Sequence, residues 1–346
     1  MTAGDVLVLR ALGLGDALTG VAALRGVRRA WPDRRLVLAA PAGTGGWLRD
    51  LGVVDAVLPT TGLDRLGPPD GDPERGGYPD RGGDPARGHV AVNLHGRGPQ
   101  SHRLLLATRP DRLVAFASPQ AGHLDGPHWR ADEHEVDRWC RLVRWAGGAC
   151  GREDLRLTVP RRDGHGRDGH GAVVLHPGAA SGSRRWPAER WSWLAARLSA
   201  AGVPVLVTGS AAETGLCEQV VAGAGGHAPP DPVVPGRRPA AGTVRSVAGA
   251  LDLPGLASLV AGAQVVVCGD TGVAHLATAV GTPSVLLFGP TPPSWWGPAL
   301  DAERHTVLWH GNGVGDPHAD TVDPALAAIT PAEVWEAVEA LLRQCG

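Results

Sequence analysis

The sequence predicts an α/β fold with two doubly wound, parallel-sheet domains. In both halves of the chain, short β-branched and apolar runs alternate with segments of helical spacing, the order typical of parallel sheets. The Gly-rich polar stretch 161–171 separates the two halves and is typical of an interdomain linker. We therefore expect domains over residues 1–165 and 170–325, followed by a helix over 331–343.

The composition fits this size and argues against some classes of function. The 346 residues, 43% of them hydrophobic, suit one large or two ordinary globular domains. The formal net charge of −2 argues against broad nucleic-acid binding. All 33 basic residues are arginines, and with 50 glycines and 30 prolines this indicates a GC-rich genome. The number of arginines therefore carries no functional meaning by itself.

The cysteines and the N-terminal stretch predict an intracellular protein. Five scattered cysteines without a CxxC pair predict reduced thiols and neither a zinc site nor a disulfide framework: Cys140, Cys150, Cys217, Cys268 and Cys345. The first residues carry Asp5 and lack a basic region before a long apolar core, so they predict a first strand and no secretory signal. No apolar run approaches the roughly 20 residues of a membrane span. We expect a cytoplasmic protein.

The first half contains five predicted strands and two predicted helices. The strands are expected over 6–9, 36–40, 56–58, 90–94 and 113–115, and the helices over 17–29 and 133–145. The Gly/Pro/Arg/Asp tract 62–88 has too few apolar residues to bury, which predicts a mobile loop. Because Asp70 and Asp72 lie in that tract, we discount them as metal ligands.

The loop after the first strand leads to Asp16. Gly13, Gly15 and Gly20 lack the GxGxxG spacing of a dinucleotide-binding loop. Asp16 follows a glycine at the predicted start of a helix, and spacing alone favours an N-cap, a position where Asp is common. The functional alternative is a general base in the cleft at the carboxyl edge of the sheet.

A second loop in the first half carries basic side chains. The segment 93–98 closes a strand, and His95, Arg97 and Arg103 could face a cleft there. The alternative is a loop whose basic side chains are simply solvated, and the sequence leaves both open.

The second half repeats the strand–helix pattern. Strands are expected over 172–175, 203–207, 265–267 and 284–288, and helices over 188–201, 256–262 and 273–280. The Pro/Gly-rich tract 226–242 predicts a loop. The terminal helix has an apolar face that could pack against either domain, formed by Val334, Trp335, Val338, Leu341 and Leu342.

The stretch 265–290 places polar residues that could bind a ligand at the end of a predicted strand. An apolar strand ends in Gly269-Asp270-Thr271-Gly272, and a small-residue helix and a second strand follow. Open α/β sheets bind ligands at the carboxyl ends of their strands, and the N–H groups at a helix start suit a phosphate. His275 could hold the turn or contact a substrate; Trp295 and Trp296 could stack on a ligand or pack, and packing is slightly favoured.

No metal site is predicted. His165 and His170 lie in the Gly-rich linker, but two histidines in such a tract do not make a closed set of ligands. No cofactor is expected either.

Four segments, taken in order, resemble glycosyltransferase family 9, the ADP-heptose:lipopolysaccharide heptosyltransferase family. They are LRALGLGDALTGVAAL, HPGAASGSRRWPAERW, VTGSAAE and GDTGVAHLATAVGTPSVLLFGPTPP, and they extend over nearly the whole chain. The resemblance implies the GT-B architecture: two Rossmann-like domains that face each other across a cleft, with the acceptor on the first and the sugar nucleotide on the second. It also implies that the C-terminal helix can cross back to the first domain.

The resemblance assigns roles to individual residues. Asp16 matches the proposed catalytic base of the family, and with the acceptor on the first domain the candidates to contact it are Gly15, His95 and Arg97. Arg184 matches the usual lysine before the Trp-Pro pair, which contacts the donor phosphates, and Arg185 is adjacent. Glu213 resembles the carboxylate proposed to hold the donor ribose. The family's D-T-G-x-x-H donor motif is matched in full, by Asp270, Thr271, Gly272 and His275.

Three positions depart from the family pattern. Leu14 replaces a common Met, and Arg184 replaces Lys, which keeps the charge and adds a planar fork suited to phosphate. The frequent PTDP motif ends here as Pro290-Thr291-Pro292-Pro293, so one carboxylate is missing. The missing carboxylate leaves recognition of the acceptor or of the donor sugar open.

The resemblance implies a metal-independent, inverting glycosyltransferase that uses a nucleoside-diphosphate sugar, with ADP as the expected nucleotide and a heptose or related sugar. The acceptor would be a hydroxyl of a cell-envelope glycan, a glycolipid or a metabolite, and a lipid-linked acceptor would fit peripheral contact with the inner face of the membrane. We expect a monomer. The alternatives are a GT-B sugar-nucleotide epimerase or phosphorylase, and a noncatalytic module that binds nucleotide sugars.

Overall fold

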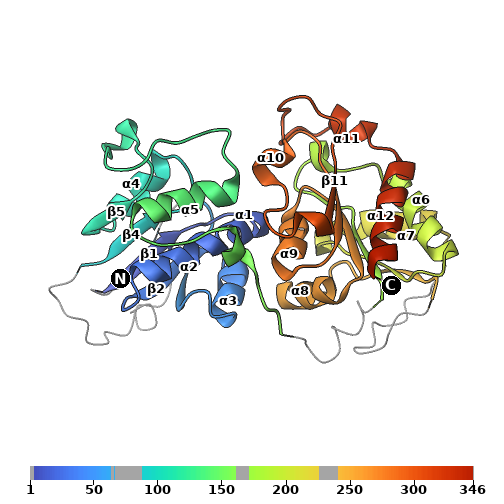
Figure 1. Cartoon of the computed structure of the whole chain (residues 1–346), viewed down its shortest axis with the longest axis horizontal. Helices are drawn as coiled ribbons and strands as arrows, with labels where there is room; N and C mark the ends of the chain where they lie inside the picture. The colour runs from blue at the N-terminus through green and yellow to red at the C-terminus, as the bar shows by residue number, and fades with distance from the viewer. Residues whose placement is uncertain (1–3, 64–65, 67–87, 161–170, 226–240, 346) are drawn as a thin grey trace. The chain divides into compact units, whose positions relative to one another are not determined.

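The computed structural model describes residues 4–63, 66, 88–160, 171–225 and 241–345 (Figure 1). The chain forms two compact units, Met1–Leu155 and Arg156–Gly346. Several segments discussed above fall mostly outside the described residues: the tract 62–88 with Asp70 and Asp72, the linker 161–171 with His165 and His170, and the tract 226–242.

The first unit is built on a five-stranded parallel sheet with the order β3-β2-β1-β4-β5. Its strands are β1 (Asp5–Leu9), β2 (Arg35–Ala40), β3 (Ala56–Pro59), β4 (Val90–Asn93) and β5 (Arg112–Val114). Successive side chains of a strand point to opposite faces of the sheet. Because Val6, Leu7, Val8 and Leu9 are all at most 1% exposed, both faces of the sheet are covered at β1, as expected for a parallel sheet.

Helices connect these strands. They are α1 (Leu14–Thr19), α2 (Val21–Ala30), α3 (Ala42–Asp50), α4 (Gln100–Leu106) and α5 (Glu135–Trp145). Helices α2 and α5 pack against each other, and α3 packs on β2 and β3. The sequence thus predicted the strands of this unit closely, but it merged α1 and α2 into one helix, which the structure divides at Gly20.

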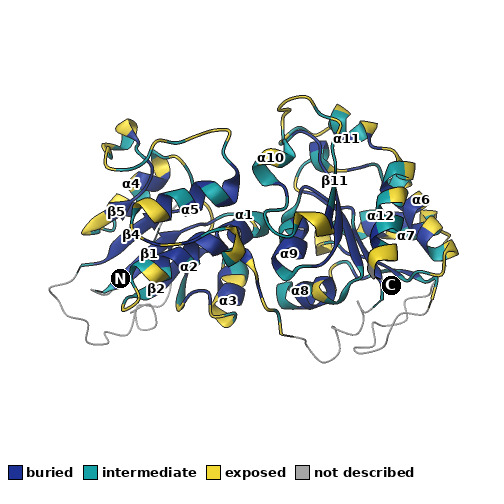
Figure 2. Cartoon of the chain, in the orientation of Figure 1, coloured by how far each residue is buried: buried dark blue, intermediate teal, exposed yellow. Residues whose placement is uncertain are grey.

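The second unit contains a six-stranded parallel sheet with the order β11-β10-β9-β6-β7-β8. Its strands are β6 (Val173–His176), β7 (Val205–Val207), β8 (Val244–Ser246), β9 (Val265–Gly269), β10 (Ser284–Leu287) and β11 (His305–Leu308). The central strand β9 is fully buried, and Figure 2 shows the strands of this sheet mostly in the colour of buried residues. The order is that of a doubly wound, Rossmann-like sheet.

The helices of the second unit are α6 (Ala188–Ala200), α7 (Thr214–Gly223), α8 (Leu253–Gly262), α9 (Gly272–Val280), α10 (Pro293–Trp296), α11 (Pro324–Ala328) and α12 (Pro331–Cys345). Helix α9 ends where Gly281 adopts a left-handed conformation with φ of 76°, which a residue with a Cβ rarely adopts. Among the described residues, the structure contains no helix long and apolar enough to span a membrane.

The C-terminal helix α12 packs within the second unit. Its apolar side chains Val334, Val338 and Leu341 are at most 3% exposed and belong to the core of the six-stranded sheet. The helix lies against α6, β9 and β10. Of the two domains that this helix could pack against, the second takes up its apolar face. That the helix also crosses back to the first domain stays a prediction.

We predict that Leu341→Ala lowers the stability of the second unit by about 2–5 kcal/mol, because it leaves a cavity where Leu341 is 3% exposed. The control on the same helix is Glu336→Ala, which changes an exposed side chain and should stay within about 0.5 kcal/mol of the parent. Urea unfolding followed by tryptophan fluorescence measures both. Equal effects of the two substitutions would contradict the packing described for α12.

Candidate active site

In the first unit, Asp16 and His95 approach the edge where β1 and β4 end. The two strands pair in parallel with Leu9 beside Asn93, so the loops that follow them leave the sheet side by side. The backbone N–H of Ala11 donates to Nδ1 of His95 at 3.2 Å, which ties the loop after β4 to the loop after β1. The structure thus brings His95 to the loop that leads to Asp16.

Asp16 is the third residue of α1 and does not cap it. The helix begins at Leu14, and its N-cap is Gly13, which makes no side-chain capping bond. The N-cap interpretation of Asp16 is therefore wrong, because the chain turns into the helix three residues earlier. Its side chain is 30% exposed, and its Oδ1 lies 3.8 Å from Nη2 of the buried Arg10. The carboxylate is therefore accessible to solvent and lies beside a buried cation, which favours its ionised form.

The environment of His95 keeps its imidazole neutral. Burial, with repulsion from the nearby Arg10 guanidinium, lowers the pKa of His95 to about 4. Because Nδ1 accepts a hydrogen bond from the backbone of Ala11, Nε2 carries the proton and can donate. The other acceptor-side candidates differ: Gly15 is half-buried in the first turn of α1, and Arg97 is exposed.

In the second unit, Arg184 and Asp270 meet at the sheet edge. Arg184 ends the short 3-10 helix Gly182–Arg184, and its Nη1 donates to the backbone carbonyl of Asp270 at 3.3 Å. Its Nε donates to Oγ of Ser181 at 3.2 Å. Arg185 is exposed, and its Nε donates to the carbonyl of Ala179 at 2.9 Å. The two arginines thus have different surroundings, and only Arg184 reaches the end of β9.

The turn after β9 leads directly into α9. Asp270 is 7% exposed, Thr271 is the extended N-cap residue, and Gly272 is the first helical residue. Thr271 Oγ1 is buried and has no conventional hydrogen-bond partner among the described residues; the Cys268 thiol is the group beside it. The start of α9 therefore places backbone amides and the positive end of a helix next to Arg184.

Glu213 has a structural role at the end of β7. Its Oε2 accepts from the backbone N–H and the hydroxyl of Ser210, each at 2.8 Å, in a capping box. Its Oε1 faces Gly178 so closely that a Cβ there would lie 2.0 Å away. The carboxylate therefore approaches the loop after β6, as a group that contacts a donor would, but it also holds its own turn.

His275 and Trp296 contact each other. Their ring centroids are 5.8 Å apart with planes tilted by 60°, and both side chains are half-buried. This contact gives His275 a packing role between α9 and α10, and it gives Trp296 the packing role that the sequence slightly favoured. Contact of His275, Trp295 or Trp296 with a substrate stays a prediction.

Arg10 and Glu135 are buried charged residues that were not predicted to belong to the site. Arg10 directly follows an apolar strand and is 1% exposed, and Glu135, at the start of α5, is 5% exposed. A charged residue at the carboxyl end of the central strand was the available signal. In the part of the chain that the structure describes, no group of three or more His, Cys, Asp or Glu side chains could hold a metal ion.

Comparison with known proteins shows the family of the chain and agrees with the fold. The profile of glycosyltransferase family 9 (heptosyltransferase) matches residues 126–317. The chain is 30% identical over 172 residues to lipopolysaccharide heptosyltransferase 2 of Escherichia coli K12, which covers 49% of this chain and 46% of that protein. The chain matches about half or less of the length of its curated relatives.

Solved structures match over nearly their full length. The ADP-heptose heptosyltransferase II of E. coli matches with a TM-score of 0.70 at 19% identity, covering 98% of this chain and 99% of that chain. The E. coli heptosyltransferase WaaC with ADP matches with a TM-score of 0.64 at 17% identity. This match covers 99% of this chain and 100% of that chain. Two parallel-sheet α/β units of this kind define the GT-B class of fold. The chain belongs to glycosyltransferase family 9.

We predict that His95 makes the protein less stable as the pH falls from about 6.5 to 4. Its pKa is about 4 in the folded chain and near 6.5 when unfolded, so the unfolded state binds more protons in this window. Histidine ring NMR should show a neutral His95 at pH 6. The difference in stability between the parent and His95→Asn should shrink as the pH falls through this window; a constant difference would contradict the burial of a neutral imidazole.

Proposed function

We propose that this protein is an inverting glycosyltransferase that moves a sugar from a nucleoside-diphosphate sugar to an acceptor hydroxyl. The observation that carries the proposal is the meeting of Arg184 with the turn at Asp270, at the N-terminus of α9, in a chain of glycosyltransferase family 9. A guanidinium and the start of a helix at the carboxyl edge of a parallel sheet suit a diphosphate.

The donor proposed is an ADP-linked heptose or a related sugar. This rests on the family and on the related heptosyltransferases, whose solved structures include one with ADP and one with ADP-2-deoxy-2-fluoro heptose. In the proposal the base and ribose lie toward Glu213, and the phosphates lie between Arg184 and Thr271. Arg185, which is exposed, adds positive charge nearby.

The reaction is a single displacement. The acceptor oxygen forms a bond to the anomeric carbon while the bond from that carbon to the diphosphate oxygen breaks, and the electron pair leaves with the nucleoside diphosphate. Asp16 takes the proton of the acceptor hydroxyl and later releases it to solvent. Attack opposite the leaving group inverts the configuration of the sugar.

Stabilisation of the leaving group is the main energetic demand. Negative charge develops on the diphosphate as the bond to the sugar breaks, and the Arg184 guanidinium can neutralise it through charge-assisted hydrogen bonds. Backbone amides at Gly272 add donors fixed in place before the reaction, and such donors contribute on the order of 3 kcal/mol each. In this proposal these groups act without a divalent metal.

The acceptor proposed is a hydroxyl of a cell-envelope glycan or glycolipid, bound by the first unit near His95 and Gly15. The family and the lipopolysaccharide enzymes among its relatives support this class of acceptor. With a lipid-linked acceptor, a monomer would act in the cytoplasm as a peripheral protein at the inner face of the membrane. Neutral His95 offers an N–H donor to a sugar hydroxyl.

We predict that Asp16→Asn lowers transfer by about 10²- to 10⁴-fold, because the amide cannot accept the acceptor proton. Affinity for ADP should be unchanged, since the proposed donor site lies in the second unit. Release of ADP from ADP-heptose in the presence of a glycolipid acceptor fraction measures transfer, and calorimetry measures ADP binding. The control is Asp33→Asn, which changes an exposed carboxylate of the same unit.

The same assay separates the alternatives. Retained transfer by Asp16→Asn would rule out its assignment as the base. Isomerisation of ADP-heptose without any acceptor would favour an epimerase, and tight ADP binding without turnover across acceptors would favour a noncatalytic module.

We predict that Arg184→Met weakens ADP binding by about 10- to 100-fold, because it removes hydrogen bonds from a charged donor worth about 1.5–3 kcal/mol. The affinity of Arg184→Lys for ADP should lie between those of Arg184→Met and the parent. Lysine keeps the positive charge but lacks the planar guanidinium that can donate two parallel hydrogen bonds. Arg304→Met, which removes an exposed charge from the same unit, is the control. Equal affinities of all four proteins for ADP would place the diphosphate elsewhere.

A further inference from the structure

Arg10 is a buried charged side chain at the centre of the first unit's sheet edge. It follows β1 directly and is 1% exposed, which is rare for an arginine unless its charge and all its donors are paired. The proposed reaction does not use it, so its burial needs another explanation.

Every donor group of this guanidinium has a partner, and the partners come from three elements. Nε donates to the backbone carbonyl of Asp16 in α1, and Nη1 donates to the backbone carbonyl of Leu94 after β4. Nη2 donates to Oγ1 of Thr19 at 2.9 Å and to Oε1 of Glu135 in α5 at 3.1 Å. One side chain thus holds the backbone of Asp16 against β4 and α5.

The packing around Arg10 leaves it little freedom. Its guanidinium carbon lies 4.9 Å from the ring centroid of Trp139. A Cβ on Gly20 would lie 2.8 Å from Cδ of Arg10, so the glycine between α1 and α2 makes room for this side chain. The position of the Asp16 backbone is therefore fixed from within the core.

Among the residues that the structure describes, the charged groups behind Arg10 carry one more positive charge than negative charge. Glu135 pairs with both Arg10 and Arg138, and Trp139 Nε1 also donates to it at 2.6 Å. Burial opposes ionisation of Glu135, but the two guanidinium groups outweigh it and hold the pKa of Glu135 below its usual value. Two buried cations thus share one buried anion.

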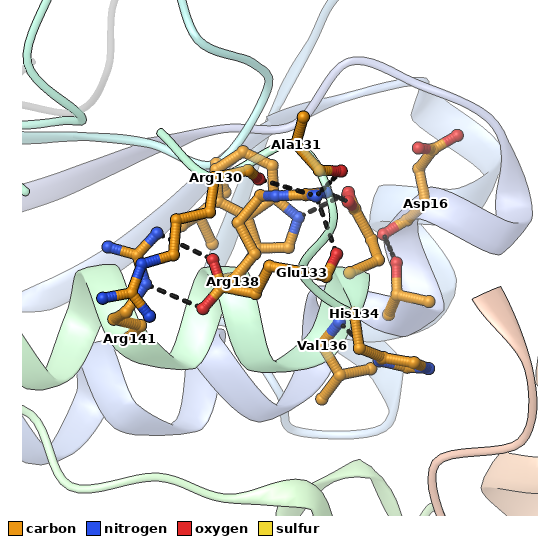
Figure 3. A network of polar contacts seen from close by, with 12 residues as sticks. Asp16, Arg130, Ala131, Glu133, His134, Val136, Arg138 and Arg141 are labelled. Atoms are coloured by element: carbon orange, nitrogen blue, oxygen red, sulfur yellow. Dashed lines mark hydrogen bonds and ion pairs between the residues drawn. The ribbon is translucent and has the colours of Figure 1, made fainter. Parts of the chain in front are cut away.

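Arg138 cannot relieve this excess through its other contacts, because they are neutral. Its Nη2 donates to three backbone carbonyls, those of Arg130, Ala131 and Glu133, as Figure 3 shows. Arg141, further along α5, pairs with Glu133 at 2.7 Å and so is balanced separately. The carboxylate that can balance the buried group is Asp16, 3.8 Å from Nη2 of Arg10.

We propose that Arg10 is a positioning residue for Asp16: it fixes the backbone that carries this side chain and, together with Glu135 and Arg138, holds its carboxylate in the ionised form. The buried group is electrically neutral only when Asp16 is ionised. The inference rests on the proposed role of Asp16 as the base, which must be ionised to accept a proton.

The titratable and charged groups around this pair come from each neighbouring element. Arg10 follows β1, His95 follows β4, and Glu135 and Arg138 lie in α5, whose N-cap is His134. The ring signals of His95 and His134 are followed in the same samples, so that their own titration steps are identified separately.

The test is a carboxyl NMR titration of Asp16 in the full chain labelled with ¹³C-aspartate, with the signal assigned by Asp16→Asn. Arg10→Met should raise the Asp16 midpoint by about one to two pH units, because it removes the adjacent cation. Glu135→Gln should lower the Asp16 midpoint, because the substitution leaves two cations near Asp16 without the carboxylate of Glu135. Arg141→Met, which removes an arginine paired with Glu133, should leave it unchanged.

Opposite shifts of the first two variants support the proposal. An Asp16 midpoint that does not move, or that moves in the same direction in both variants, overturns the proposal. A nonspecific loss of local structure would shift the midpoint of both variants toward the ordinary value for an exposed Asp. If Arg10→Met does not fold, the Glu135→Gln variant alone tests the proposal. A lower Asp16 midpoint in this variant supports the proposal, and an unchanged or higher midpoint overturns it. The titration needs no substrate, so its failure is distinct from failure of the proposed transfer reaction.

The positioning role has a kinetic readout as well. Arg10→Lys keeps the charge but cannot provide the full set of hydrogen bonds made by the guanidinium. With ADP-heptose as donor, kcat should fall while the KM for the donor stays unchanged. A rise in KM with an unchanged kcat would contradict a role through Asp16.

Discussion

Parallel pairing of strands is the constraint on which the rest of this structure depends. It sends every strand of a sheet in one direction, so the loops that carry polar residues leave from a single edge. In the first unit this edge gathers Arg10 after β1 and His95 after β4, and in the second it gathers Asp270 after β9 beside Arg184. Residues far apart in the chain become neighbours because the apolar strands between them are buried.

Both edges use arginine, but in opposite ways. Arg10 is buried, and its N–H groups donate hydrogen bonds within the protein. Its charge therefore acts on the nearby carboxylate of Asp16. Arg184 is only partly buried and makes two longer bonds, at 3.2 and 3.3 Å, which a diphosphate could replace. In the proposed function, the first arrangement holds the proton acceptor ionised, and the second binds the diphosphate.

The sequence predicted the parts of the molecule that depend on local pattern. The two-domain organisation, the motif around Asp270 and most of the strands follow from apolar runs. The short edge strands β8 and β11 were not predicted, because neither forms a distinct apolar run in the sequence. Arg10 and Glu135 could not be predicted as a pair, because 125 residues separate them and only the packing of α5 beside the sheet brings them together. The start of α1 was misplaced because Gly13 caps this helix without a side chain, and no sequence signal marks such a cap.

The most direct test of the account is calorimetric titration of the purified chain with ADP, GDP, UDP and NAD, each in EDTA and again with Mg²⁺. The account predicts that ADP binds, that binding is the same in EDTA, and that the other three ligands bind more weakly. Binding of NAD alone, or ADP binding that disappears in EDTA, would contradict a metal-independent nucleoside-diphosphate site at the edge of the second sheet.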